Sequence, residues 1–331
     1  MLKSKKKTYI ILTIILLLIV LLWQMKSKNS NSSLAYDFAV TDTSAVSKIF
    51  IADLKGNSIS LDRMENNWQI NNRYKVRNNA MNIILKTIKN ISVQRPVSES
   101  SYNRVITDLA TNGVKIEIYQ NLNKKPTKTY TIGNNTADHT GTYMLLANHE
   151  QPYIMHIIGF NGIMGPRYGL QGQEVDITVW RDKNIFNLNP KKIISITLIN
   201  ERGQDSSFTI KNEGGNLLLF NHQKKQVRAK QETLRQYLNF FKKINCETFK
   251  NENISEKLEE SKKLYSLIVA HQNGVDSLII YQMREEGKPR TKQEQYTVER
   301  MYAVLNSGDV MLVQNYVFNR LLITIDELKG E

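Results

Sequence analysis

The sequence contains a single cysteine, Cys246, among its 331 residues. One thiol cannot form an intramolecular disulfide, and it cannot build a zinc or iron–sulfur site that needs several cysteine ligands. The histidine context that is typical of a thiol enzyme is also missing around it. We therefore interpret Cys246 as a small buried residue.

Histidine is scarce as well. The five histidines are His139, His149, His156, His222 and His271. Metal sites on a helix use histidines three or four residues apart, whereas these lie far apart on predicted turns and strands. His149 and His156 flank one predicted strand, where their separation directs them to opposite faces. The sequence predicts no metal and no cofactor.

Motifs for the common enzymatic chemistries are absent. The glycine-rich stretch 159–172 lacks the Gly-Lys-Ser/Thr ending of a phosphate-binding loop. Ser206-Ser207 lies outside any Gly-x-Ser-x-Gly motif. Acid pairs such as Glu259-Glu260 lie in charge-rich segments that are typical of solvated surface. These absences favour a protein that is not an enzyme.

The charge of the chain is positive but dispersed. Lys and Arg number 45 against 31 Asp and Glu, which gives a net charge of +14. Residues 1–28 contribute six lysines and no acid, so the remainder is left with 39 basic and 31 acidic residues. Acidic and basic residues interleave over 256–263 rather than forming a stripe with stacking aromatics. The sequence therefore predicts no nucleic-acid partner.

One long apolar run, IILTIILLLIVLLW, covers residues 10–23. A helix over 9–25 would rise about 25 Å, which approaches the ~30 Å of a bilayer's hydrocarbon core when flanking lysines snorkel. More lysines precede the run than follow it, which places the N-terminus in the cytoplasm. We expect a cytoplasmic basic tail (1–8), a single-pass anchor in the inner (cytoplasmic) membrane (9–25) and a tether (26–44). The bulk of the chain would then be periplasmic or otherwise extracytoplasmic.

Two other interpretations of this run stay open. A cleaved signal peptide has the same basic start and apolar segment. Its small-x-small site would be Ser33-Leu34-Ala35, twelve residues past Trp23, which is remote for a cleavage site. A soluble helix is the second alternative, although a helix that is apolar all round is a poor soluble element.

The rest of the chain repeats one pattern of strands, turns and a helix. Apolar alternation at 48–54, a Gly56-Asn57 turn and a further alternation predict a β-hairpin, and the order recurs from Ile196 onward. Apolar spacing of i, i+3, i+4 and i+7 predicts helices over 79–91 and 231–243. The buried pairs expected on them are Met81/Leu234, Ile84/Tyr237, Leu85/Leu238 and Ile88/Phe241.

Matching landmarks in the two halves are separated by 147 to 159 residues in one consistent order. We therefore predict an α+β fold with two tandem duplicated modules, 45–185 and 186–331, after the transmembrane helix. Each module is expected to be an antiparallel β-meander with one packed helix.

The first half has 13 additional residues within 159–172. Because the second half closes its sheet without them, we predict that this segment contacts a partner. Its candidate contact residues are Phe160, Met164, Arg167 and Tyr168. The alternative is that the segment only covers an edge of its own sheet.

Four segments carry a resemblance to a known family: KIFIADLKGNSISLDRMENNWQI, YTIGNN, GTYMLLANHEQPYIMHIIGF and WRDKNIFNL. Together they resemble the domain-of-unknown-function family numbered 4340. The resemblance implies a membrane-anchored bacterial protein that faces the periplasm or exterior. It also implies a link to auxiliary components of ABC transporters related to gliding-motility systems. It brings no catalytic residues to this chain.

These observations together lead to one expected function and one alternative. We expect a non-enzymatic, membrane-anchored binding or scaffolding protein of the bacterial envelope, with another envelope protein as its partner, auxiliary to an ABC-type transporter. The alternative is an envelope hydrolase or polysaccharide-modifying enzyme, whose converging carboxylates or Ser/His pair the sequence does not reveal.

Overall fold

The computed structural model describes residues 37–250, 254–284 and 296–329. The predicted tail, the predicted anchor over 9–25 and most of the tether therefore lie outside the described residues. Within those described ranges, no helix is long and apolar enough to cross a membrane. The chain divides into two compact units, with the boundary between Asp176 and Ile177.

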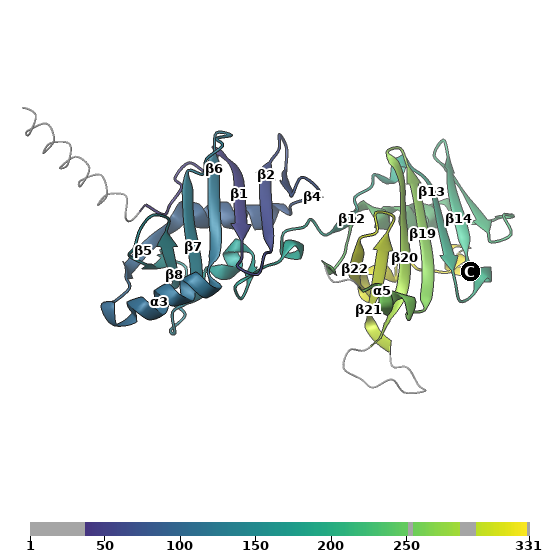
Figure 1. The fold of residues 1–331 in the computed structure, drawn as a ribbon. Helices are drawn as coiled ribbons and strands as arrows, with labels where there is room; N and C mark the ends of the chain where they lie inside the picture. The colour runs from purple at the N-terminus through teal and green to yellow at the C-terminus, as the bar shows by residue number, and fades with distance from the viewer. Residues whose placement is uncertain (1–36, 251–253, 285–295, 330–331) are drawn as a thin grey trace, which may run out of the picture. The chain divides into compact units, whose positions relative to one another are not determined.

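The first unit is built on a nine-stranded antiparallel sheet (Figure 1). Its strand order is β4-β3-β2-β1-β6-β7-β8-β9-β5. The strands are β1 (Val46–Ala52), β2 (Ser58–Arg63), β3 (Trp68–Ile70), β4 (Tyr74–Lys75), β5 (Ile91–Pro96), β6 (Val114–Gln120), β7 (Lys128–Asn135), β8 (Thr142–Leu146) and β9 (Tyr153–Ile157). A separate short hairpin pairs β10 (Leu170–Gln171) with β11 (Glu174–Val175).

The second unit has a nine-stranded sheet of the same topology. Its order, β16-β15-β14-β13-β19-β20-β21-β22-β18, matches the first sheet strand for strand. The strands are β13 (Ile193–Asn200), β14 (Phe208–Glu213), β15 (Asn216–Asn221), β16 (Gln226–Val227), β18 (Thr248–Phe249), β19 (Lys263–His271), β20 (Gly274–Arg284), β21 (Tyr296–Leu305) and β22 (Val310–Gln314). The predicted α+β class with tandem antiparallel sheets is confirmed, and the two similar sheets agree with the predicted internal repeat.

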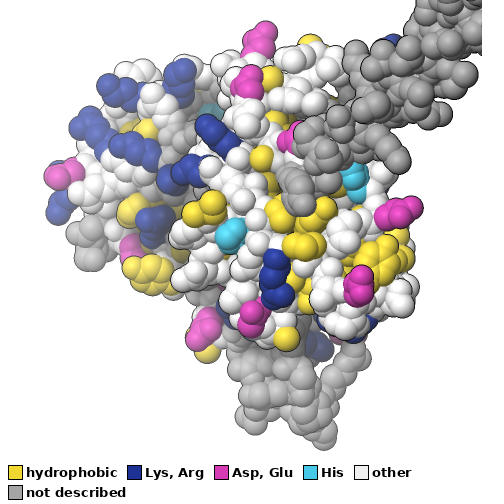
Figure 2. Space-filling view, turned by 90° about the vertical axis from the view of Figure 1, so that its left-hand side faces the viewer, with side chains coloured by type: hydrophobic (Ala, Val, Ile, Leu, Met, Phe, Trp, Pro, Cys, Tyr) yellow, Lys and Arg dark blue, Asp and Glu magenta, His cyan; other side chains and the backbone are white. Residues whose placement is uncertain are grey.

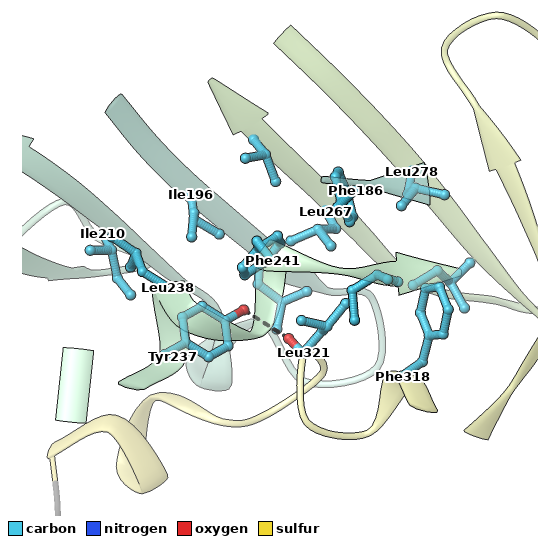
Figure 3. Close-up of a cluster of buried hydrophobic side chains, with 14 of the residues drawn as sticks. Phe186, Ile196, Ile210, Tyr237, Leu238, Phe241, Leu267, Leu278, Phe318 and Leu321 are labelled. Atoms are coloured by element: carbon cyan, nitrogen blue, oxygen red, sulfur yellow. Dashed lines mark hydrogen bonds between the residues drawn. The ribbon is translucent and has the colours of Figure 1, made fainter. Parts of the chain in front are cut away.

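In each unit, one long helix packs on the face of the sheet that carries the main hydrophobic core, which we call the inner face. These helices are α2 (Asn78–Asn90) and α4 (Gln231–Asn239), and α4 continues into the 3₁₀ turn η5 (Phe240–Lys242). Seven of the eight predicted helix positions are buried, while Leu85 is half-buried. In the second unit, Tyr237 and Phe241 lie in the core, and the Tyr237 hydroxyl donates to the Leu321 carbonyl at 2.8 Å (Figure 3).

The prediction of one helix per module is wrong. A second helix, α3 (Glu99–Asn112), lies on the outer face of the first sheet, against β7 and β8 (Figure 1). Val105 and Leu109 pack there on Ile154. Among the described residues between the corresponding strands of the second unit, β18 and β19, the helical element is the short α5 (Ser255–Glu259). The meander is also interrupted, because β5 and β18 leave the chain order and pair with β9 and β22.

The stretch 177–185, which was predicted to belong to the first module, packs in the second unit. Strand β12 (Asn184–Phe186) pairs with β17 (Ile244–Asn245). The buried Arg181 contacts the Asp309 carboxylate at 3.1 Å and stacks 3.5 Å from the Phe249 ring centroid. Phe186 is fully buried in the core of the second unit, which explains why this stretch packs there.

Exposed hydrophobic side chains occur on the surface of both units. Figure 2 shows one face, where hydrophobic side chains lie between dispersed Asp and Glu side chains and several Lys and Arg side chains lie close together. Scattered exposed side chains such as Leu122 and Ile158 are ordinary on a protein surface and do not define a site.

Candidate functional site

A groove with a volume of about 650 Å³ lies in the second unit, beside α4. Three elements form its walls: the 3₁₀ turn η3 (Pro190–Lys192) leading into β13, the turn between β14 and β15, and the side of α4 that carries Arg235. This volume falls within the roughly 300–1,000 Å³ that is typical of small-molecule sites. We refer to this feature as the groove.

The floor of the groove is apolar. Ile193, Leu217 and Leu238 line it and are nearly fully buried, while Ile194 extends the apolar surface outward with 51% of its area exposed. On the side of β15 that faces away from β14, Leu217 has no strand beside it, since β16 pairs only with Leu219 and Phe220. The Gln231 side chain fills that position and fixes the floor to the first turn of α4.

Gln231 does so with two hydrogen bonds to the backbone of Leu217. The Gln231 Nε2 donates to the Leu217 carbonyl at 2.7 Å, and the Leu217 N–H donates to Gln231 Oε1 at 3.1 Å. The side-chain amide therefore imitates the neighbouring strand that is missing there.

The rim of the groove is basic. Lys191, Lys192 and Arg235 line it with exposed side chains, and no Asp or Glu is among the lining residues. Within the described ranges, no ion pair joins any of these three cations to an acid. The remaining polar groups of the lining are the amides of Asn212, Asn239 and Gln272. The groove thus combines a positive rim with an apolar floor.

Two glycines keep one wall open. Gly214 and Gly215, in the β14–β15 turn, have φ angles of +62° and +99°, which side-chain-bearing residues rarely adopt. A Cβ atom added at either residue would meet nothing within 4 Å. Asn212 holds this turn, because its Oδ1 accepts from the Gly215 N–H and its Nδ2 donates to the Ile193 carbonyl, both at 2.9 Å.

The corresponding place in the first unit is filled. Asn212 pairs with Leu217 across β14 and β15, and Arg63 pairs with Trp68 across the matching β2 and β3. The Arg63 guanidinium stacks 4.7 Å from the Trp68 ring centroid, and its Nη2 donates to the Thr43 carbonyl at 2.9 Å. A bulky stacked pair therefore stands where the second unit has a small amide and a leucine.

The four residues predicted to contact a partner pack against the first unit itself, on α2, β7 and β8. Met164 and Tyr168 are fully buried, which corrects their assignment to a contact surface. The Tyr168 hydroxyl lies 2.9 Å from that of Tyr130. Arg167 Nε donates to Thr87 Oγ1 of α2 at 2.8 Å, and its guanidinium lies 4.5 Å from the Phe160 ring centroid. Only Phe160 and Arg167 keep partial exposure.

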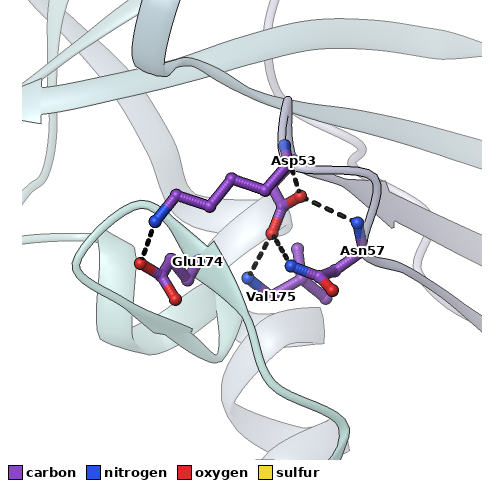
Figure 4. A network of polar contacts seen from close by, with 5 residues as sticks. Asp53, Asn57, Glu174 and Val175 are labelled. Carbon is purple, nitrogen blue, oxygen red and sulfur yellow. Dashed lines mark hydrogen bonds and ion pairs between the residues drawn. The ribbon is translucent and has the colours of Figure 1, made fainter.

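The end of the same segment is held by Asp53 (Figure 4). The buried Asp53 carboxylate accepts hydrogen bonds from the backbone N–H groups of Lys55 and Asn57, both at 2.9 Å, and from that of Val175 at 3.0 Å. Burial alone would raise the pKa of Asp53, but these hydrogen bonds outweigh it and lower the pKa below its usual value. An ion pair of Lys55 with Glu174 lies beside it. Residues 159–175 are thus integrated into the first unit.

Nucleophilic and metal-binding chemistry finds little support in the described part of the chain. Burial raises the pKa of the Cys246 thiol to about 12, so the reactive thiolate is suppressed. No group of three or more His, Cys, Asp or Glu side chains that could hold a metal ion occurs among the described residues.

The groove could not be predicted from the sequence, because its lining residues form no recognisable motif. The signal that could have found it is the internal repeat, once the strand registers place Leu217 opposite Asn212 where the first unit has Trp68 opposite Arg63.

Comparison with models of known protein families places part of the chain in a family. The family model described as "Domain of unknown function (DUF4340)" matches residues 68–264, more than half of the chain. The match begins at Trp68 in the first unit and ends within β19 of the second, so it includes most of the groove. No curated protein and no solved structure matches the chain.

Proposed function

The chain belongs to the DUF4340 family, and we propose that it is a non-enzymatic, membrane-anchored binding and scaffolding protein of the bacterial envelope. In this proposal the groove of the second unit is its binding site. One observation carries the proposal: the groove is open and basic, while the matching place in the first unit is filled by Arg63 and Trp68.

The difference between the units supports different roles for them, with ligand binding in the second unit. We propose that both descend from one duplicated module, since their sheets share one strand order. Neither half of the Arg63–Trp68 stack is retained in the second unit, and three cations surround the opening instead. Loss of filling side chains together with gain of one sign of charge is expected where a ligand takes their place.

The location in this proposal rests on the sequence. The apolar run at 10–23 and the lysine excess before it would hold both units outside the cytoplasmic membrane. The partner would then be an envelope protein, with an ABC-type transporter as the assembly that the family resemblance suggests. Protease added to intact spheroplasts should digest the chain beyond about residue 30. A mature protein that begins near residue 36 would contradict the anchor.

Photo-crosslinking from the groove tests the function. A photoreactive amino acid in place of Ile194, whose side chain is half exposed at the floor, should give covalent adducts in intact cells. The control replaces Leu54, which is 62% exposed in the first unit and lies outside the groove. Adducts at 194 that are absent at 54 support a binding groove. Equal adducts at both positions, or adducts at neither, contradict it.

A further inference from the structure

We infer that the groove binds a single-chain anionic amphiphile, that is, a phosphate or carboxylate head on a hydrocarbon chain. The head would lie between Lys191, Lys192 and Arg235, and the chain would lie along the apolar floor. This inference rests on the proposed function and specifies its ligand.

The positions of the three cations favour an anionic head. Lys191 and Lys192 come from one wall and Arg235 from another, so a head group between the walls could contact all of them. Asn189 fixes the turn that carries the lysines, because its Oδ1 accepts from the Lys191 N–H at 3.1 Å. Arginine and lysine bind phosphate and carboxylate through charge-assisted hydrogen bonds, which are about twice as strong as neutral ones.

The floor favours a hydrocarbon chain. Ile193, Leu217 and Leu238 offer it only aliphatic carbon, and burial of apolar surface contributes about 25 cal/mol per Å². The groove lining contains no aromatic ring on which a nucleobase could stack. Ile194 continues the aliphatic surface toward solvent, which gives a chain a path into the groove.

An acidic peptide is the less favoured occupant. A peptide that added to the sheet would need free backbone groups at the edge of β15. The edge backbone at the groove is already occupied, since both the N–H and the carbonyl of Leu217 bond to Gln231. A ligand can therefore contact the side chains of the groove, but a peptide cannot add to β15 as a further strand at Leu217.

In the first unit, two side chains of the protein itself form a contact that resembles the proposed complex. There, the apolar Trp68 ring lies beneath the Arg63 cation in the place that corresponds to the groove. The proposed ligand reproduces that arrangement in the second unit, with an aliphatic chain on Leu217 beneath the cations of the rim.

Photolabelling of the full-length protein in membrane vesicles tests this inference. The probe is dodecyl phosphate that carries a diazirine at the chain end, and labelled peptides are identified by mass spectrometry. We expect labelling within 190–194 and 234–239, with labelling of the apolar N-terminal run as an internal reference. The double variant K191Q/K192Q should reduce groove labelling about tenfold relative to that reference.

The matched control is K86Q/K89Q. It removes two exposed lysines from α2, the corresponding helix of the first unit, and should leave groove labelling unchanged. Competition identifies the chemistry: unlabelled dodecyl phosphate should compete, whereas inorganic phosphate and dodecyl maltoside should not. Competition by inorganic phosphate would show that the site binds only the anion. Equal competition by dodecyl maltoside would show that the groove is a nonspecific apolar surface. Either result overturns the inference, as does unchanged labelling in K191Q/K192Q.

Failure of the inference is distinguishable from failure of the proposed function. If the probe does not label the groove while crosslinks from position 194 persist, the groove binds a different ligand and only the amphiphile is excluded. If those crosslinks are absent as well, the proposed function fails.

Discussion

The guanidinium of Arg63 stacks on the indole ring of Trp68, 4.7 Å from its centroid, and the pair closes a space that the second unit leaves open. The two residues face each other across β2 and β3 in the register that joins Asn212 and Leu217 across β14 and β15. Two units of one topology thus differ in whether the space beside the long helix is occupied by the chain itself.

The long helices should differ in their sensitivity to truncation. Leu238→Ala removes a side chain that is 3% exposed and should lower the free energy of unfolding by about 2–5 kcal/mol. Leu85→Ala, at the matching position of α2, should cost less because Leu85 is half-buried. Urea unfolding of both variants makes the comparison. An equal or larger loss in Leu85→Ala would contradict the burial described for α2.

The segment 159–172 should behave as part of the first core. Tyr168→Phe leaves the fully buried Tyr130 hydroxyl without its partner and should cost about 1–3 kcal/mol of stability. Tyr102→Phe is the control, since the Tyr102 hydroxyl donates to the Glu150 carbonyl at the surface. Thermal unfolding should separate the two variants. If Tyr168→Phe is as stable as its control, the segment is not integrated as described.

Asp53 should make the first unit sensitive to acid. Its pKa is lowered in the folded state, so its stabilising contribution is present above the ordinary aspartate pKa and is lost as pH falls through the folded value. Asp53→Asn should therefore lower stability at pH 7 by about 1–3 kcal/mol and flatten the decline below about pH 4. The control is Glu65→Gln, which changes an exposed carboxylate of the same unit. If the stability of Asp53→Asn and of the unmodified protein depends on pH in the same way, the Asp53 hydrogen bonds do not stabilise the first unit as described.

Cys246 should resist thiol reagents in the folded protein. Burial raises its pKa to about 12, so almost no thiolate is present at pH 8. Modification by a disulfide reagent should be slow in native buffer and rapid in guanidinium chloride, where the thiol is exposed. Rapid modification of the native protein would show that Cys246 is accessible and reactive.

Periodicity was sufficient for the parts of the fold with dense apolar patterns. The i, i+3, i+4 spacing predicted α2 and α4, and the glycine turns predicted the hairpins of both sheets. Helix α3 escaped prediction because only Val105 and Leu109 of its 14 residues are buried, which is too sparse a stripe. The pairing of β5 with β9 escaped because strand order depends on contacts that are distant in sequence.

The role of 159–172 was harder to predict for a physical reason. Its length suggested a dispensable loop, because the second half lacks a matching insertion. In the second unit, the C-terminal segment covers the corresponding helix, α4. Its residues Phe318, Leu321 and Leu328 are fully buried in the same core as α4. Sequence comparison of the halves cannot detect that two unrelated segments bury the same surface. It also could not detect the groove without the strand registers, which place the smaller Asn212 and Leu217 where the first unit has Arg63 and Trp68.

The most direct test of a functional groove is to fill it with the pair that fills the first unit. The double variant N212R/L217W should abolish the crosslinks from position 194 in protein that remains folded by circular dichroism, although it loses the two Asn212 hydrogen bonds of the β14–β15 turn. The reciprocal variant R63N/W68L, in the first unit, should leave those crosslinks unchanged. Undiminished crosslinking from position 194 in folded N212R/L217W would contradict a binding role for the groove.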